Sequence, residues 1–286
     1  MSDLGRRVLV ALSGAPLAIA AIWYGDAALA FIASALAAIA AWEFFRIARE
    51  GGSTPIVPLG VVLAAAIPLL THAHYLGAVR FPLAVGVSLT VLAIVALTIW
   101  LRGVGGKPLA AAATTVLGVA YTGGTLSYIY ALRYFNYAVG DTAGALVVIL
   151  PVLLTWASDT GAFFAGRTIG GRKLMPSVSP GKTVSGAIGG IVTTVIVCTI
   201  FVHYLLRPYA SLAFTPAGLL LFGVGISVTA QIGDLAESLL KREAGVKDSG
   251  TLFPGHGGVL DRLDSMFFVL PVAFALYGWL LIAAPG

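Results

Sequence analysis

The order of apolar and polar residues divides the chain into nine long hydrophobic segments, bounded by charged residues, Gly or Pro. They are roughly 16 to 25 residues long, which is the length range of membrane-spanning α-helices, and none shows the alternation of a membrane β-barrel strand. We therefore expect an all-α integral membrane protein, a polytopic bundle of about nine transmembrane helices. The predicted spans are residues 8–24, 27–46, 56–70, 81–101, 109–133, 143–165, 185–206, 216–240 and 263–283.

Two spans allow more than one interpretation. The first follows Arg6 and Arg7, as the apolar core of a signal peptide does, but no typical cleavage site is obvious and more spans follow, so we favour a retained helix. The fifth is interrupted by Gly123 and Gly124, and the pattern fits either one broken helix or two short ones. No internal repeat is visible, so the sequence gives no support to an inverted-repeat transporter.

Composition agrees with the hydrophobic pattern. The chain is 59% hydrophobic and 10% charged, whereas soluble domains carry about 25% charged residues. A single cysteine, Cys198, excludes an internal disulfide framework. The basic pI of 9.4 does not indicate nucleic-acid binding, because the basic residues lie in short loops beside the spans.

Basic residues also predict the orientation of the chain. Nine spans place 14 of the 17 Lys and Arg residues on one side, which the positive-inside rule assigns to the cytoplasm of a cell (inner) membrane. The 14 are Arg6, Arg7, Arg46, Arg49, Arg102, Lys107, Arg167, Arg172, Lys173, Lys182, Lys241, Arg242, Lys247 and Arg262, against Arg80, Arg133 and Arg207. We expect residues 1–140 to hold spans one to five, and residues 141–286 to form a catalytic region with cytoplasmic loops 166–185 and 242–262.

Residues 227–265 carry the densest polar chemistry, with 6 of the 12 acidic residues of the chain. Read as a helix, their first part places five polar residues on one stripe of an apolar rod. These are Ser227, Gln231, Asp234, Ser238 and Lys241.

Three carboxylates fall within predicted spans. Asp159 lies eight residues before Arg167, which is about 12 Å along a helix. Asp234 and Glu237 precede Lys241 by seven and four residues. An ionised group at this depth costs at least about 2.5 kcal/mol unless it is paired or faces water. The sequence therefore leaves two interpretations: polar contacts between buried helices, or an active site near the cytoplasmic surface.

Two loops on the same side suit a phosphate reaction. Residues 166–186 are rich in Gly, Lys, Arg, Ser and Thr, which bind anions well, although an ordinary positive-inside loop has the same composition. In the second loop, Gly- and Pro-rich turns lead to Asp261 and Asp264, three residues apart on one face of the last helix. Carboxylate oxygens suit Mg²⁺.

These motifs resemble a known family. The segment SLLKREAGVKDSGTLFPGHGGVLDRLDS, residues 238–265, closely resembles the signature of the phosphatidate cytidylyltransferases, or CDP-diacylglycerol synthases. We call it the signature segment. The upstream runs SDTGAFFAGR, SPGKT and GDLAES also resemble family motifs, whereas the first 150 residues match only as apolar spans. Ser185 departs from the family, in which Glu is frequent at this position, so no role is assigned to it.

The resemblance implies that CTP and phosphatidate give CDP-diacylglycerol and pyrophosphate, with the lipid in the bilayer and Mg²⁺ as cofactor. A second, monovalent cation and a homodimer both stay open. Asp234 and Asp261 are the implied metal ligands, and the implied catalytic group adds Lys241, Asp159 and Asp264. The implied substrate-binding residues are Arg167, Lys173, Ser179, Lys182, Thr183, Ser238, Arg242, Lys247, Asp248, His256 and Arg262.

No strong protein base is needed for this reaction, because the second pKa of a phosphate monoester is about 6 and the nucleophile is already ionised at neutral pH. We therefore do not expect His256 to act as a general base. The main difficulty is repulsion between a phosphate dianion and a triphosphate, which a divalent metal and basic side chains reduce.

Two other functions are weighed against this one. A related CTP-dependent transferase would act on an isoprenoid ether phosphate or a polyprenol, and would differ only in its acceptor cleft. An ion or anion transporter would use Asp159, Asp234 and Glu237 along a pathway, but transporters usually place such groups near the membrane midplane.

Overall fold

The computed structural model describes residues 16–80, 83–136, 138–250 and 257–284. Helices dominate this part of the chain, and seven of them are long and apolar enough to cross a membrane. The expected all-α membrane fold is confirmed. These seven match predicted spans two, three and five to nine, while the fourth corresponds to α4 (Leu83–Leu101), whose strongly apolar part, Val85–Leu101, is shorter. Of the first predicted span only residues 16–24 are described, and they are helical.

The chain forms two compact units. The first consists mainly of Asp26–Tyr130 and Leu240–Leu263, and the second mainly of Ala131–Leu239 and Asp264–Gly286. Each unit therefore draws on separate parts of the sequence. This division by contact differs from the division at residue 140 that the sequence suggests, which stays a prediction about where catalysis occurs.

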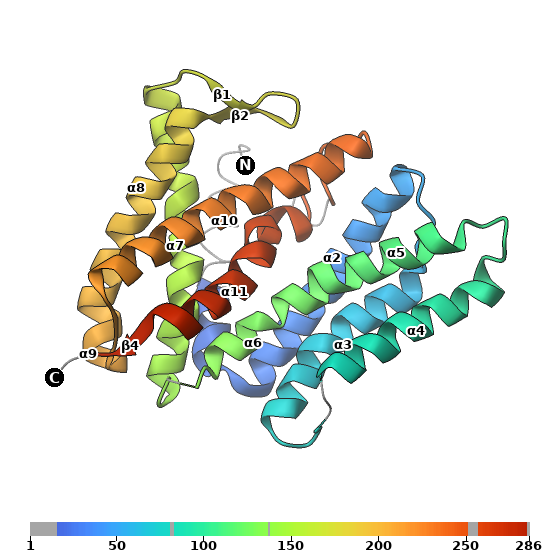
Figure 1. Ribbon diagram of the computed structural model, residues 1–286, viewed down its shortest axis with the longest axis horizontal. Helices are drawn as coiled ribbons and strands as arrows, with labels where there is room; N and C mark the ends of the chain where they lie inside the picture. The colour runs from blue at the N-terminus through green and yellow to red at the C-terminus, as the bar shows by residue number, and fades with distance from the viewer. Residues whose placement is uncertain (1–15, 81–82, 137, 251–256, 285–286) are drawn as a thin grey trace. The chain divides into compact units, whose positions relative to one another are not determined.

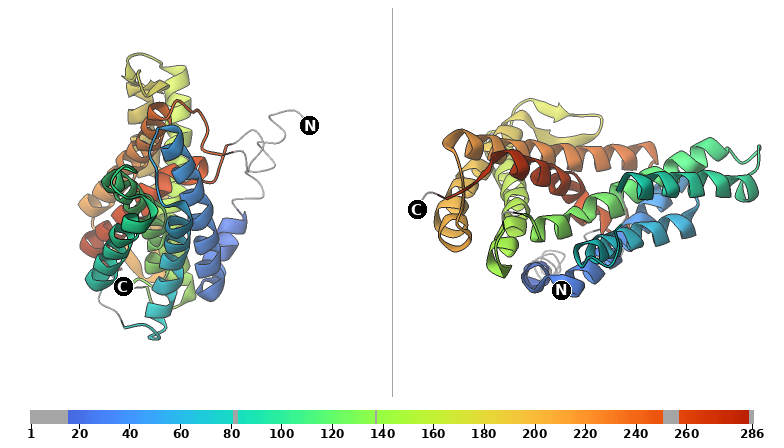
Figure 2. Two further views of the ribbon diagram at one scale, coloured as in Figure 1. Left: turned by 90° about the vertical axis from the view of Figure 1, so that its right-hand side faces the viewer. Right: turned by 60° about the horizontal axis from the view of Figure 1, so that its bottom comes forward.

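The first unit is a bundle whose neighbouring helices α2 and α3, α3 and α5, and α4 and α5 pack together (Figures 1 and 2). Gly60 and Gly118 let the Phe45 ring approach closely, since a Cβ atom at either glycine would lie within 2.4 Å of it. In lipid no hydrophobic effect drives helices together, so close van der Waals packing must stabilise such crossings, and small residues permit it. The helices are α2 (Asp26–Glu50), α3 (Val57–Tyr75), α4, α5 (Pro108–Val119) and the π-helix η1 (Ala120–Gly124).

The two-glycine interruption in the fifth span proves to be a π-helical turn. α5, η1 and α6 (Tyr128–Arg133) follow one another within a single apolar stretch, Pro108–Arg133. A Cβ atom at Gly123 would lie 2.3 Å from the backbone oxygen of Ala64, so glycine is required for α3 to pack there. The span is one continuous irregular helix.

In the second unit, α7 and α8 pack side by side and the β1–β2 hairpin extends from one end of the pair (Figure 1). β1 and β2 are antiparallel, as are β3 and β4. The buried Arg133 guanidinium donates to the carbonyl oxygens of Ile22 and Trp23, which ties residues 18–25 to this unit. The elements are α7 (Asp141–Thr168), β1 (Lys173–Met175), β2 (Ser179–Thr183), α8 (Val184–Phe201), η2 (Val202–Leu206), α9 (Arg207–Ala210), β3 (Leu212–Phe214) and β4 (Leu281–Ala283).

The last two long helices, α10 (Pro216–Glu243) and α11 (Leu260–Leu280), contribute to both units. Three expected boundaries need correction. Residues 166–185 are not simply a loop, because α7 continues to Thr168 and a hairpin follows. α10 continues into the expected second loop as far as Glu243, and α11 begins at Leu260 rather than at residue 263. Asp261 consequently lies in the first turn of α11.

Candidate active site

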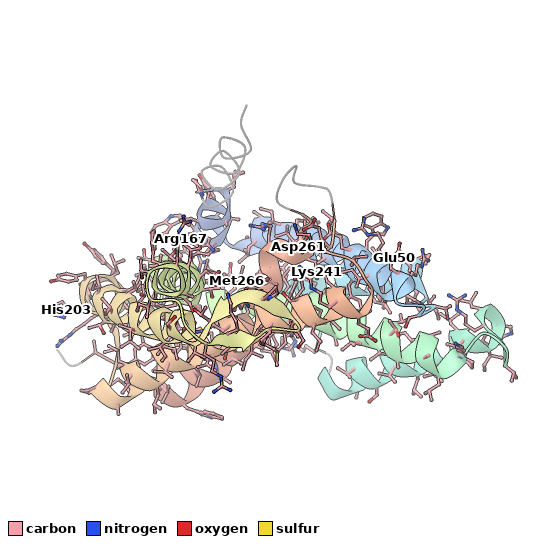
Figure 3. The ribbon with its side chains drawn as sticks, turned by 90° about the horizontal axis from the view of Figure 1, so that it is seen from above. Glu50, Arg167, His203, Lys241, Asp261 and Met266 are labelled. Atoms are coloured by element: carbon pink, nitrogen blue, oxygen red, sulfur yellow. The ribbon has the colours of Figure 1, made fainter. Side chains whose placement is uncertain are left out.

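Asp261 is the most extensively bonded carboxylate of the signature segment. Lys241, in the last turn of α10, donates from Nζ to Asp261 Oδ1 at 2.5 Å. Asp261 Oδ2 accepts three bonds, each 2.8 Å long, from the Ser249 N–H, the Ser249 hydroxyl and the Gly258 N–H. The Lys241 and Asp261 side chains are only 13% and 7% exposed (Figure 3). Four donors therefore hold this carboxylate in a single buried position.

Asp234 forms a second lysine–carboxylate pair. Lys182 on β2 places its Nζ 2.7 Å from Asp234 Oδ2 on α10, with side chains 25% and 34% exposed. The Ser238 hydroxyl lies 3.5 Å from Asp234 Oδ1, which is too long for a strong bond. The hairpin and α10 thus bring together two residues predicted for the same site, in a more open setting than Asp261.

The polar residues on α10 make different contacts at its start and toward its end: hydrogen bonds to other helices first, and ion pairs later. At its start, the Ser227 hydroxyl bonds that of Ser158 at 2.8 Å. The Gln231 amide then donates to the Ala187 carbonyl oxygen and to Ser227, each at 3.2 Å. The bonds to Ser158 and Ala187 join α10 to α7 and α8, as the buried-contact interpretation predicts. Further along, Asp234 and Lys241 form the ion pairs described above.

The hairpin fastens to α8 through hydroxyl groups. Thr183 caps α8, accepting a bond from the Gly186 N–H at 3.1 Å. The Ser185 hydroxyl donates to the Gly170 carbonyl oxygen at 2.5 Å and lies 3.0 Å from the Thr183 hydroxyl. Ser185, unassigned from the sequence, thus anchors the loop between α7 and β1.

Other predicted site residues are less enclosed. Asp159 is exposed on α7, and Asp264 is half-buried with its Oδ1 accepting the Ser265 N–H at 2.6 Å. The guanidinium of Arg167 lies 6.0 Å from the Phe163 ring centre. Lys173, Arg242, Lys247, Asp248 and Arg262 are exposed, and Ser179 is half-buried. His256 lies outside the described residues.

Glu43 was not predicted from the sequence. Its carboxylate is buried in α2, accepts bonds from the N–H groups of Val259 and Leu260, and lies 3.1 Å from the Ser249 hydroxyl oxygen, all in the signature segment. The signal was present, because Glu43 is the only charged residue between Asp26 and Arg46 in an apolar span. The same depth argument that singled out Asp159 and Asp234 applies to it.

The residues fit a divalent cation in their chemistry. Asp234 and Asp261 offer the hard oxygen ligands that Mg²⁺ prefers, and each already holds a positive lysine ammonium. Within the described residues no cluster of three or more His, Cys, Asp or Glu side chains could hold a metal alone. Protein ligands would then need to be completed by water or substrate phosphate, as is usual for Mg²⁺. Because Asp234 and Asp261 belong to different units, their sharing one metal stays a prediction.

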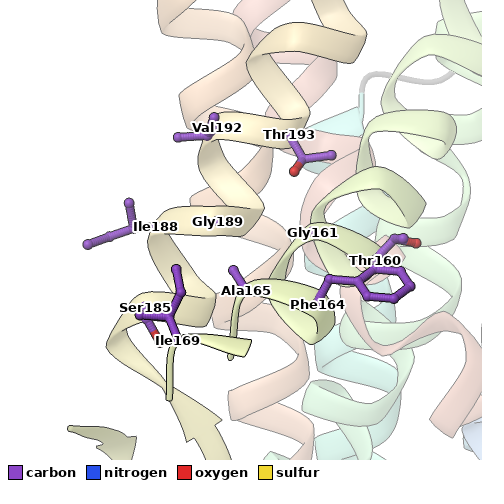
Figure 4. Close-up of a pocket in the computed structure, with 10 residues that line it drawn as sticks. All are labelled: Thr160, Gly161, Phe164, Ala165, Ile169, Ser185, Ile188, Gly189, Val192 and Thr193. Atoms are coloured by element: carbon purple, nitrogen blue, oxygen red, sulfur yellow. The ribbon is translucent and has the colours of Figure 1, made fainter. Parts of the chain in front are cut away.

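A separate pocket of about 660 Å³ lies between α7 and α8 (Figure 4). Its lining is almost entirely apolar and includes Phe164, Ile188 and Val192. No predicted catalytic or substrate-binding side chain lines it. This pocket therefore adds no residue to the predicted site.

Comparison with known proteins assigns the chain to a family. The model of the cytidylyltransferase family matches residues 5–280. This chain belongs to the cytidylyltransferase family. It is similar to the phosphatidate cytidylyltransferases of Bacillus subtilis, 43% identical over 156 residues, and Haemophilus influenzae, 41% identical over 150 residues. These matches cover 53% and 52% of this chain, and 56% and 52% of those proteins, so the chain spans about half the length of these relatives.

A third relative extends the similarity over nearly the whole molecule. The phosphatidate cytidylyltransferase of Synechocystis is 32% identical over an alignment of 295 residues, covering 94% of each chain. The family membership expected from the signature segment is confirmed. The membrane helices and the signature segment both fall within the residues matched by the family model.

Proposed function

We propose that this chain transfers the cytidylyl group of CTP to phosphatidate, giving CDP-diacylglycerol and pyrophosphate. The observation that carries the proposal is the pairing of lysines with the two implied metal ligands, Lys182 with Asp234 and Lys241 with Asp261, in a member of the cytidylyltransferase family. Relatives that bear the name phosphatidate cytidylyltransferase support this choice of substrates.

The reaction has a simple atomic balance. A phosphate oxygen of phosphatidate bonds to the α-phosphorus of CTP, and the bond from that phosphorus to the bridging oxygen of the β-phosphate breaks. Pyrophosphate leaves with those electrons. No protein nucleophile is used and no strong base is needed, since the attacking phosphate is largely ionised near neutral pH.

The protein's task is to bring together anions that repel one another. Lys182, Lys241, Lys173 and Arg262 would contact phosphate oxygens, while Asp159 and Asp264 would support the polar site. When bound, Mg²⁺ would neutralise phosphate charge and favour departure of pyrophosphate. Asp234 and Asp261 would hold it, because their oxygens are suitable ligands and already attract cationic groups.

The buried bonds to Asp261 indicate a preorganised group. Its carboxylate is held by bonds from within the protein, from Ser249 and Gly258, so little rearrangement of the protein is needed when charge develops in the transition state. Asp234 is more accessible and suits a position where ligands enter.

An acceptor panel tests the proposal. Purified protein is incubated with labelled CTP and, separately, phosphatidate, an isoprenoid ether phosphate or a polyprenol, with Mg²⁺ present or chelated. We expect labelled lipid only with phosphatidate and Mg²⁺. Turnover only with another acceptor would show that a related lipid, and not phosphatidate, is the substrate. Equal turnover with ATP, GTP and UTP would contradict the choice of CTP.

We also propose that the protein lies in the bacterial inner membrane with the hairpin and signature segment facing the cytoplasm, as the basic-residue split predicts. Ser177 is exposed between β1 and β2, and the native Cys198 is buried. In a Cys198→Ser background, Ser177→Cys should react with a membrane-impermeant thiol reagent only after the cytoplasmic face is opened. Labelling of intact cells would contradict this orientation.

A further inference from the structure

Glu43 is a buried carboxylate within a membrane-spanning helix. It lies on α2, is 1% exposed, and follows a run of Ala and other apolar residues. A carboxylate in such a place is costly unless donors satisfy its oxygens. The N–H groups of Val259 and Leu260 do so, and the Ser249 hydroxyl lies within bonding distance as well. All three groups come from the signature segment, about 200 residues later in the chain.

These donors lie at the start of α11. The Leu260 N–H donates to Glu43 Oε2 at 2.8 Å, and the Val259 N–H donates to Oε1 at 3.2 Å. The first N–H groups of a helix have no partner within the helix, and the helix dipole favours negative charge there. Glu43 therefore caps α11 from a different helix, immediately before Asp261.

The Ser249 hydroxyl lies between the Glu43 and Asp261 carboxylates, and its single hydrogen can be donated to one of them at a time. The Ser249 hydroxyl lies 3.1 Å from Glu43 Oε2 and 2.8 Å from Asp261 Oδ2. One turn further along α2, Arg46 donates to the backbone oxygen of Ser249. α2 thus fixes both segments that hold Asp261: the backbone around Ser249 and the start of α11.

Two glycines of the signature segment make room for Glu43. A Cβ atom at Gly250 would lie 2.2 Å from Glu43 Oε1, and one at Gly258 would lie 2.2 Å from both carboxylate oxygens. Such distances exclude a side chain unless the cap moves. Gly258 is therefore explained by its contact with a carboxylate as well as by a turn.

We propose that Glu43 is a positioning residue for Asp261, acting through Ser249 and through the capped start of α11. The inference rests on the proposed function, because it assigns Asp261 to catalysis. Glu43 itself is not expected to touch substrate or metal. A glutamine would place an NH₂ group against backbone donors, so Glu43→Gln should disturb this arrangement with little change in side-chain volume.

The matched test compares Glu43→Gln with Glu50→Gln, which removes an exposed carboxylate from the end of the same helix (Figure 3). Per folded molecule, we expect Glu43→Gln to lower kcat at least tenfold while KM for CTP changes less than threefold. Hydrogen exchange at Val259 and Leu260 should become at least tenfold faster. Glu50→Gln should match the parent in both measurements.

A clash variant gives an independent arm. Gly258→Ala should lower kcat in the parent protein. A Glu43→Ala background should already have a low kcat, and adding Gly258→Ala there should lower it little further, because the space is open. Gly105→Ala, at a loop glycine with nothing within 4 Å of its Cβ position, serves as the control. If Glu43→Gln does not accumulate as folded protein, the same kcat measurement on Ser249→Ala and on this cycle tests the positioning role. Unchanged kcat in Ser249→Ala and in Gly258→Ala would overturn it.

The outcomes separate the two proposals. A parent protein without cytidylyl transfer overturns the proposed function, and the exchange measurement then decides alone whether Glu43 caps α11. An active parent with unchanged kcat and unchanged exchange in Glu43→Gln overturns the positioning role. A loss of thermal stability with normal kcat per folded molecule also overturns it, because that result describes a merely structural group.

Discussion

Asp234 and Asp261 are both paired with lysine, but their surroundings differ. Asp261 is 7% exposed and accepts four hydrogen bonds, three of them from Ser249 and Gly258. Asp234 is 34% exposed, and its main partner is Lys182 on the hairpin. The signature segment therefore holds Asp261 in a fixed position, whereas Asp234 and its hairpin partner Lys182 form a more exposed pair.

The largest expected effect belongs to Asp261→Asn. We expect turnover to fall at least 10²-fold, as for loss of a preorganised electrostatic contact worth about 2.7–4 kcal/mol. The amide would also face donors that now bond a carboxylate, so unfolding should become easier by about 1–3 kcal/mol. Turnover and thermal unfolding in detergent check both parts, with Glu243→Gln on the exposed end of α10 as the control. Near-normal turnover in a folded variant would remove Asp261 from the site.

Asp234→Asn should separate activity from stability. We expect a loss of turnover of the same order, about 10²-fold, but a smaller loss of stability than for Asp261→Asn, because Asp234 accepts fewer hydrogen bonds and an Asn oxygen can still face Lys182. The same two assays apply. A fall in thermal stability that parallels the lost activity would favour the interpretation of Asp234 as a structural contact between helices.

A smaller effect is expected for Lys182→Met. If Lys182 leaves Asp234 to contact phosphate, KM for CTP should rise about tenfold, which corresponds to about 1.4 kcal/mol of binding. Steady-state kinetics at saturating lipid measures this change. Lys107→Met, an exposed lysine before α5, should leave KM unaltered; an equal rise in both variants would indicate general electrostatic attraction only.

The smallest effect concerns the hairpin's attachment. Thr183→Val removes the cap of α8 and should lower stability by about 1 kcal/mol. Thr183→Ser keeps the hydroxyl and should unfold as the parent does. Equal unfolding midpoints for the two variants would show that this cap contributes nothing measurable.

Hydrophobic length predicted most of the fold, because a spanning helix leaves a long and simple signal. The π-helical turn at Gly123 was not decided by the sequence, since it depends on how closely α3 packs. The hairpin at residues 173–183 was read as a loop because its exposed strands lack an apolar face.

Site residues that lie in recognisable motifs were predicted from the sequence. Residues whose contacts depend on how distant segments pack together were not. Lys182 and Asp234 were expected in one site and form an ion pair. Asp159 and Glu237 looked alike by depth, yet Asp159 is exposed and Glu237 is buried. Glu43 was missed because its partners lie about 200 residues away, and no local spacing reveals that contact.

The position of the label in CTP tests the central claim most directly. Purified protein receives phosphatidate, Mg²⁺ and CTP labelled in either the α- or the γ-phosphate, and the lipid and aqueous products are separated. Cytidylyl transfer predicts that α-label enters the lipid and γ-label is released as pyrophosphate. Entry of γ-label into the lipid would show phosphoryl transfer instead. A lipid that stays unlabelled with either labelled form of CTP would contradict cytidylyl transfer to phosphatidate.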